Sequence, residues 1–137
     1  MLTYKDVITG EDLFSEMYPV NLVDDAVYEV GLITEDKNLV EEFNLQPINL
    51  DKRAIANRFN KFSKAVTKYL NASDSDSDAA SRFQKGSSSY LKKILNELSR
   101  YNFYTGPSGN EEGMVIMVRD EETALVWKYG VQHHETE

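Results

Sequence analysis

Side chains able to do covalent chemistry are scarce in this chain. It contains no cysteine and only two histidines, His133 and His134, which are adjacent near its end. Thiolate zinc sites, disulfides and cysteine nucleophiles are therefore excluded. Adjacent histidines do not converge on a metal as an i, i+4 pair on a helix does, and no phosphate-binding glycine motif is present. We therefore expect a binding protein that is not an enzyme and that requires no metal or other cofactor.

Three aspartates resemble the start of a calcium site. Asp74, Asp76 and Asp78 alternate with other residues as in an EF-hand loop, which also needs glycine at its sixth position and glutamate at its twelfth. Ala79 and Lys85 stand at those two positions. A solvated turn, open to serine phosphorylation, is favoured over a calcium cage, and weak calcium binding is kept as the alternative.

The feature that stands out most is a run of cations. Residues 51–71 carry six basic side chains and one acidic one, although the chain as a whole has a net charge of −8. The six are Lys52, Arg53, Arg58, Lys61, Lys64 and Lys68. They predict either a surface for an acidic partner or, with about equal weight, a face that is solvated or docks on the acidic remainder of the chain. Nucleic acid is disfavoured because that remainder repels phosphate.

Acidic residues gather near the start of the chain and in a late turn. They are Glu11, Asp12, Glu16, Asp24, Asp25, Glu111 and Glu112. Such residues can attract a basic partner surface, but exposed acids of this kind more often serve only as solubilising groups.

A scaffold of short strands and two helices must position these charges. Apolar residues recur at helical spacing from Ile55 to Leu70 and again from Phe83 to Tyr101, which predicts a helical hairpin. Asn49 or Asp51 can cap the first helix. Gly86, followed by three serines, predicts a bend or a close approach to the first helix.

Short aromatic and β-branched runs on both sides of the hairpin predict strands. The expected strands cover residues 2–8, 12–18, 26–33, 39–45, 101–105, 113–118 and 123–129. We expect one domain over residues 1–137, with a β body at 1–48 and 101–131, a helical hairpin at 49–100 and a flexible tail at 132–137. With no apolar run near the ~20 residues of a membrane span and no signal-like start, we expect a cytoplasmic and mostly monomeric protein.

Several segments resemble, in the same order, the translationally controlled tumour protein (TCTP) family. Residues 1–8 and 12–18 resemble its opening, and residues 101–106, 113–115 and 127–130 resemble its C-terminal signature region. Leu45-Gln46 and residues 83–95 match its helical hairpin.

The resemblance implies an α+β fold, with a twisted mixed β body and a projecting two-helix hairpin. The fold is similar to that of GTPase exchange-factor-like proteins and of B-type methionine sulfoxide reductases, whose cysteine nucleophile is missing here. It also implies a cytoplasmic regulator of growth that binds Ras-type small GTPases, calcium weakly, and tubulin.

Two binding surfaces follow from the resemblance. The leading expectation is that an acidic edge of the β body, formed by Glu11, Asp12, Glu111 and Glu112, contacts a small GTPase. The alternative is a microtubule or scaffold adaptor that binds acidic tails through the six cations.

The chain departs from the family pattern at two places. Leu32 and Leu39 are separated by six residues, where the family usually carries a long acidic loop. Pro107 follows Gly106, where the family places an acidic residue. Functions that the family attributes to the long loop therefore do not carry over to this chain from the resemblance. Pro107 also leaves the expected GTPase-binding surface without one of its carboxylates.

Overall fold

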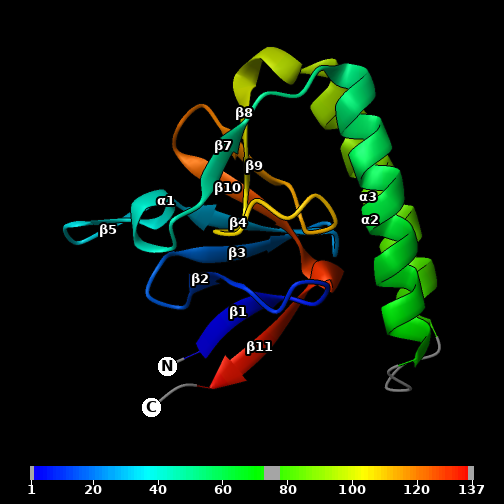
Figure 1. Cartoon of the computed structure of the whole chain (residues 1–137), viewed down its shortest axis with the longest axis horizontal. Helices are drawn as coiled ribbons and strands as arrows, with labels where there is room; N and C mark the ends of the chain where they lie inside the picture. Colours follow the sequence, from blue (N-terminus) through cyan, green and yellow to red (C-terminus); the bar gives the residue numbers. More distant parts are fainter. Residues whose placement is uncertain (1, 73–77, 136–137) are drawn as a thin grey trace.

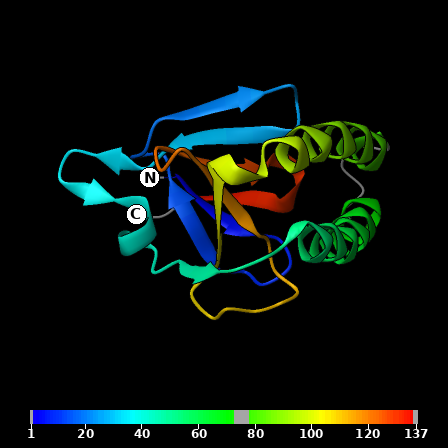
Figure 2. The same cartoon turned by 90° about the horizontal axis from the view of Figure 1, so that it is seen from above.

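The computed structural model describes residues 2–72 and 78–135, and it shows a β body with two long helices along one side (Figure 1). The two helices lie side by side in the view from above (Figure 2). The predicted α+β class and the helical hairpin are therefore confirmed. Within these described ranges, every helix is too short or too polar to cross a membrane.

The β body contains a six-stranded sheet, a three-stranded sheet and a two-stranded hairpin. Their orders are β3-β4-β10-β9-β8-β7, β11-β1-β2 and β5-β6, and each pairing is antiparallel, although a mixed body was expected. The strands are β1 (Leu2–Asp6), β2 (Asp12–Ser15), β3 (Val20–Val23), β4 (Val27–Gly31), β5 (Ile33–Thr34), β6 (Lys37–Asn38), β7 (Gln46–Ile48), β8 (Tyr101–Thr105), β9 (Ile116–Arg119), β10 (Thr123–Trp127) and β11 (Val131–Glu135).

The helical elements lie between strands in the sequence, four of them between β4 and β8 and η2 between β10 and β11. They are α1 (Leu39–Glu42), α2 (Lys52–Ala72), α3 (Ala79–Asn96), and the 3-10 turns η1 (Leu98–Arg100) and η2 (Lys128–Gly130). Asp51 caps α2, since its Oδ1 accepts a hydrogen bond from the Ala54 N–H at 2.7 Å.

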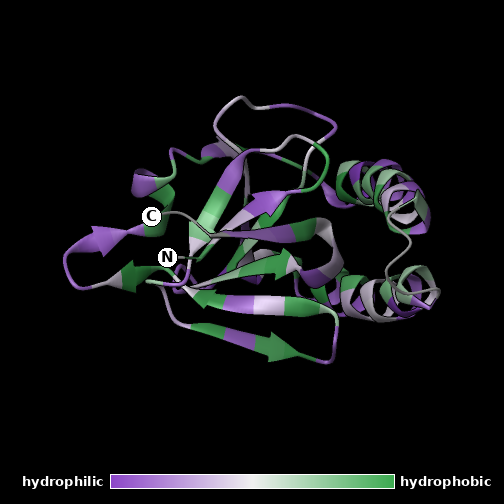
Figure 3. Ribbon diagram, turned by 90° about the horizontal axis from the view of Figure 1, so that it is seen from below, coloured by the Kyte–Doolittle hydropathy of each residue, from purple (hydrophilic) through white to green (hydrophobic). Residues whose placement is uncertain are grey.

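Both long helices are amphipathic and cover the β body with their apolar sides (Figure 3). Ile55, Phe62 and Val66 of α2 are buried. Phe59 packs against Trp127 of β10 with ring centroids 5.2 Å apart. The core therefore continues from the sheet into the helix layer.

The strand expected at residues 39–45 is wrong, because this segment begins with the helix α1. Asn38 caps that helix, accepting hydrogen bonds from the N–H groups of Val40 and Glu41 at 2.9 and 3.4 Å. Asn44 then takes a left-handed φ of 53°, which asparagine tolerates better than most residues. A local cap thus overrides the strand-like composition of the segment.

The flexible tail expected at residues 132–137 is also wrong over its described part. β11 pairs antiparallel with β1, from Leu2 opposite Glu135 to Asp6 opposite Val131. His133 lies against the ring of Tyr4, with ring centroids 4.6 Å apart. The polar composition of this strand is explained by its position at a sheet edge, where side chains meet solvent.

Gly86 makes a close approach, but to the β body and not to the first helix. A Cβ at this position would lie 3.2 Å from the Cβ of Ala26. Ser87 is buried beside it and donates to the Phe83 carbonyl oxygen. The small residues therefore seat α3 on the chain that precedes β4.

Candidate functional site

The acidic edge of the β body is built around Glu11, which follows the turn between β1 and β2. Its Oε2 accepts from the Ser108 N–H at 2.8 Å, and its Oε1 accepts from the Ser108 hydroxyl at 2.8 Å. Glu11 therefore holds residues 106–112, a loop 97 residues away in the sequence, against the first hairpin. This loop carries Glu111 and Glu112.

Asp6, which the sequence reasoning did not single out, fastens the same region from inside. Its carboxylate is 2% exposed and accepts from the N–H groups of Ile8 and Met114 at 2.8 and 2.7 Å. Burial raises the pKa of Asp6, while these hydrogen bonds oppose the rise. An aspartate just before a Thr-Gly turn was the available signal, since such side chains commonly bond the backbone two residues on.

The other three acids of this edge differ in whether their carboxylates have a partner within the chain. Asp12 pairs with Lys5, whose Nζ lies 2.7 Å from Oδ1, and its side chain remains 49% exposed. Glu111 and Glu112 are exposed, and their carboxylates have no partner among the described residues. Glu11 and Asp12 thus already have internal partners, whereas Glu111 and Glu112 lie on the loop that Glu11 holds through Ser108.

A second acidic group, Asp24 and Asp25, binds the chain's own cations. Asp25 accepts hydrogen bonds from the Lys128 ammonium and, at 3.0 Å, from the Tyr129 hydroxyl, and it lies 4.0 Å from Arg82 of α3. Lys93 of α3 lies 3.5 Å from Asp24. The hydrogen bond from Lys128 holds the pKa of Asp25 below its usual value. Cations of α3 therefore dock on the acidic body, whereas the docking alternative concerns the six cations of residues 51–71.

The cations of α2 have a different environment. Lys52, Arg53, Lys61, Lys64 and Lys68 are exposed, and none of their side chains bonds to another residue in the described part of the chain. Arg58 departs from the expected outward face, because its Nε and Nη2 atoms are buried. The structure therefore leaves five of the six predicted cations on an open helix surface.

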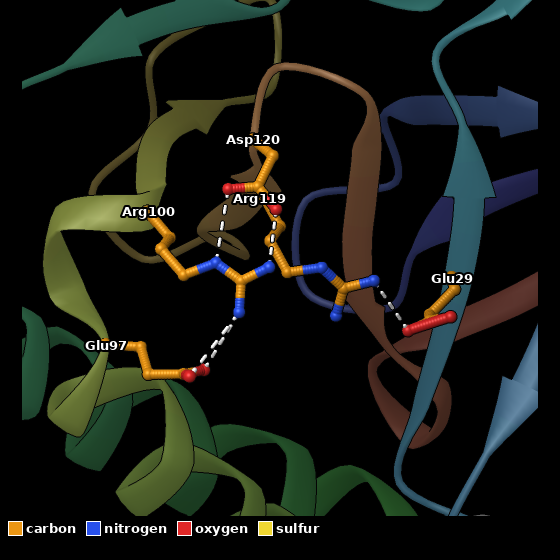
Figure 4. A network of polar contacts seen from close by, with 5 residues as sticks. All are labelled: Glu29, Glu97, Arg100, Arg119 and Asp120. Atoms are coloured by element: carbon orange, nitrogen blue, oxygen red, sulfur yellow. Dashed lines mark hydrogen bonds and ion pairs between the residues drawn. The ribbon is translucent and has the colours of Figure 1, made fainter.

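A network of arginines secures the end of the hairpin nearest to β8 and β9 (Figure 4). Arg100 of η1 binds Asp120 through Nε, at 3.2 Å, and through Nη2, and it also lies 3.4 Å from Glu97. Arg119 of β9 reaches Glu29 of β4 at 3.1 Å. Arg100 lowers the pKa of Asp120 through its hydrogen bond. Sequence spacing offered no signal for the Arg100–Asp120 and Arg119–Glu29 pairs, since these residues meet only when the sheet forms.

Metal ligands do not cluster in the described part of the chain, where no three His, Cys, Asp or Glu side chains could hold one ion. Asp74 and Asp76 of the calcium-like motif lie outside the described residues. Weak calcium binding therefore stays a prediction.

Comparisons with known proteins place this geometry in a family. Residues 1–35 and 33–132 match the sequence profile of translationally controlled tumour protein. A TCTP homolog of Candida albicans is 31% identical over 167 aligned positions, covering 98% of this chain and 99% of its own. A TCTP homolog of Schizosaccharomyces pombe is 30% identical and covers 91% of this chain and 90% of its own.

Solved structures agree with the sequence match. The translationally controlled tumour-associated protein p23fyp of Schizosaccharomyces pombe superposes with a TM-score of 0.82 at 26% identity, covering 99% of this chain and 100% of its own. TCTP of Caenorhabditis elegans, at 21% identity and a TM-score of 0.75 with full coverage of both chains, supports the fold.

The β5–β6 hairpin marks the position at which the family's long loop is absent from this chain. The two profile matches meet at residues 33–35, on the β5–β6 hairpin, and the Candida alignment is longer than the 137 residues of this chain. A tight hairpin therefore stands where relatives have additional residues. Because the family profile matches residues 1–132 of the 137 in this chain, the chain belongs to the translationally controlled tumour protein family.

Proposed function

We propose that this TCTP-family protein is a regulatory binding protein, without catalytic activity, whose α2 binds an acidic protein segment such as the tails of tubulin. The observation that supports this proposal best is the contrast between the two helices. Arg82 and Lys93 of α3 are paired with the acidic body, whereas five cations of α2 are exposed and have no partner in the described structure.

Physical reasoning connects that contrast to binding. Lysines along one exposed helix attract an acidic, extended peptide without needing a deep pocket, and the acidic remainder of the chain repels the same peptide elsewhere. Such binding rests on exposed charges, which are screened within about 8 Å at physiological ionic strength. It should therefore weaken steeply as salt is added.

Co-sedimentation with microtubules tests the proposal. The variant Lys64→Glu/Lys68→Glu should lose most of the binding seen for the unchanged protein. Its matched control is Lys85→Glu/Lys92→Glu, which makes the same charge change at exposed positions of α3. Equal binding by both variants, or binding by the unchanged protein that salt does not weaken, would count against the proposal.

A second candidate is contact with a Ras-type small GTPase through Glu11, Asp12, Glu111 and Glu112. The observation that favours it is the clamp between Glu11 and Ser108, which brings the loop of Glu111 and Glu112 to the first hairpin. Asp12→Ala should reduce capture of a GDP-bound Ras-type GTPase, and a panel of such GTPases that shows no binding would remove this candidate.

A further inference from the structure

Ser108 joins the loop at 106–112 to the first hairpin. Its hydroxyl donates to Oε1 of Glu11 at 2.8 Å, and its N–H donates to Oε2 of the same carboxylate at 2.8 Å. The serine itself is exposed, and the gold loop that carries it projects from the β body in the view from above (Figure 2). An accessible serine hydroxyl thus takes part in a contact between segments 97 residues apart.

The sequence after Ser108 is acidic at positions that one class of protein kinase selects. Glu111 and Glu112 lie three and four residues after it, and both are exposed. Kinases with a basic substrate groove choose a serine or threonine with an acidic residue three positions on, through charge complementarity. Among the described residues, Thr3, Thr9 and Ser108 have such an acid. Thr3 is buried and Thr9 is half-buried, so Ser108 is the exposed one of the three.

A phosphate on Ser108 is incompatible with the contact to Glu11. The modified oxygen has no proton to donate, and the phosphate carries about −1.5 to −2 charges at pH 7 beside the Glu11 carboxylate. Like charges at this distance repel, and the exposed acids of the loop, Glu111 and Glu112, add to the repulsion. The same side chain that holds the loop when unmodified therefore drives it away when phosphorylated.

We propose that Ser108 is a phosphorylation site for an acid-directed protein kinase, and that its phosphate releases the loop at 106–112 from Glu11. In this step the Ser108 Oγ attacks the terminal phosphorus of ATP. The new Oγ–P bond forms as the bond to the bridging oxygen of ADP breaks, and the hydroxyl proton passes to the base of the kinase. The site is separate from the exposed cations of α2, so it goes beyond the proposed function and does not depend on it.

Phosphorylation of the full chain by casein kinase II and ATP, with each phosphate mapped by mass spectrometry, tests the proposal. Mapping is needed because Ser73 and Ser75 also precede an acidic residue by three positions. The unchanged protein should carry phosphate at Ser108. In the phosphorylated protein the amides of residues 108–112 should exchange with solvent faster than before, because the loop has left Glu11.

One pair of variants tests how the kinase selects the site. Glu111→Gln/Glu112→Gln should lower the initial rate at Ser108 by about tenfold or more, because the acids that match a basic groove are gone. Its matched control is Glu121→Gln/Glu122→Gln, which makes the same charge change at another exposed turn and should leave the rate unchanged.

A second pair tests whether the contact with Glu11 guards the hydroxyl. Glu11→Ala should raise the initial rate at Ser108 by about fivefold or more, because the hydroxyl no longer has to leave an acceptor before it reacts. Asp12→Ala, which removes a neighbouring acid paired with Lys5, is the control and should leave the rate unchanged. Buried Thr3 should stay unmodified in both variants, which shows that their sheets are intact.

Three results would overturn the proposal. One is the absence of phosphate at Ser108 in both the unchanged protein and Glu11→Ala. Another is an equal rate at Ser108 in Glu111→Gln/Glu112→Gln and in its control, which would mean that the acids do not direct the kinase. The third is unchanged amide exchange at residues 108–112 after phosphorylation, which would mean that the phosphate does not release the loop.

Discussion

At the scale of single residues, buried and half-buried carboxylates join parts of the chain that are far apart in sequence. Asp6 accepts from the Met114 N–H, and Glu11 accepts from Ser108 through both carboxylate oxygens. The two acids therefore hold the loop at 106–113 from its two ends. The GTPase candidate depends on this loop being held in place.

Replacing Glu11 should loosen that loop without unfolding the protein. Glu11→Ala removes the acceptor of two hydrogen bonds to Ser108, and the expected loss is about 1–2 kcal/mol of unfolding free energy. Hydrogen exchange should show faster exchange of the Ser108 amide. Glu112→Ala, which removes an exposed carboxylate of the same loop, is the control and should leave that amide unchanged. Equal protection in both variants would show that Glu11 does not hold the loop.

Gly130 is required by packing. A Cβ on this residue would lie 2.5 Å from the Met114 methyl carbon and 2.8 Å from Cζ of Phe62. Gly130→Ala should therefore destabilise the protein by about 1–3 kcal/mol in urea unfolding. Phe62→Leu should partly relieve this cost, so the double variant should lose less stability than the sum of the two single changes. Strict additivity would contradict the contact between Gly130 and Phe62.

Residue-level partners were largely beyond sequence reasoning. Asp51 was one of the two predicted helix caps, because a cap and its N–H groups are neighbours in the chain. Asp6, Arg100 and Arg58 were missed in their actual roles, because their surroundings come from segments that only the folded sheet brings together. The sequence showed Arg58 as one cation of a basic run and could not show which way it points.

At the scale of elements, the helical spacing of apolar residues predicted α2 and α3. The strand β11 was not predicted, because its composition is polar. α2 and α3 each have several apolar residues on one face, so their existence followed from spacing alone. β11 is polar and its register depends on β1, so nothing local marked it as a strand. α1 has only four residues, too few for a period to be seen.

The strand β11 should prove necessary for the stability of the three-stranded sheet. Ending the chain after Gly130 removes the antiparallel partner of β1 and the buried Val131. We expect a loss of about 3 kcal/mol or more, from several ladder hydrogen bonds and the lost apolar burial. Amide exchange in β1 should accelerate most. Unchanged urea unfolding of the shortened chain would mean that this segment is a dispensable tail.

The pairing of Asp25 with Lys128 should give the stability a defined pH dependence. The pKa of Asp25 is below its usual 3.8 in the folded protein, because Lys128 bonds to its carboxylate. Its contribution is therefore complete above about pH 3.8 and is lost as the pH falls through the folded-state value.

Asp25→Asn should accordingly cost about 0.5–1 kcal/mol at neutral pH, a small value because the pair is half exposed. The difference from the unchanged protein should shrink as the solution is acidified. Asp24→Asn, whose Lys93 pair is more exposed, should cost less. A deficit of Asp25→Asn that is the same at pH 7 and pH 2 would contradict the pairing.

At the scale of the whole molecule, charge is divided between an acidic β body and an outward basic helix. α3 uses part of its positive charge to dock, while α2 keeps its positive charge exposed to solvent. The overall charge of −8 conceals this division, which the segment charges revealed. The relation of each helix to the body could not be read from the sequence, because it depends on which helix faces Asp24 and Asp25.

The most direct test of the account compares binding to intact microtubules with binding to microtubules whose acidic tails have been removed by limited proteolysis. The unchanged protein should co-sediment with intact microtubules at low salt and should lose most of this binding when the tails are removed. Lys64→Glu/Lys68→Glu should bind both preparations equally weakly. Undiminished binding of the unchanged protein to tail-free microtubules would contradict the claim that α2 binds an acidic segment.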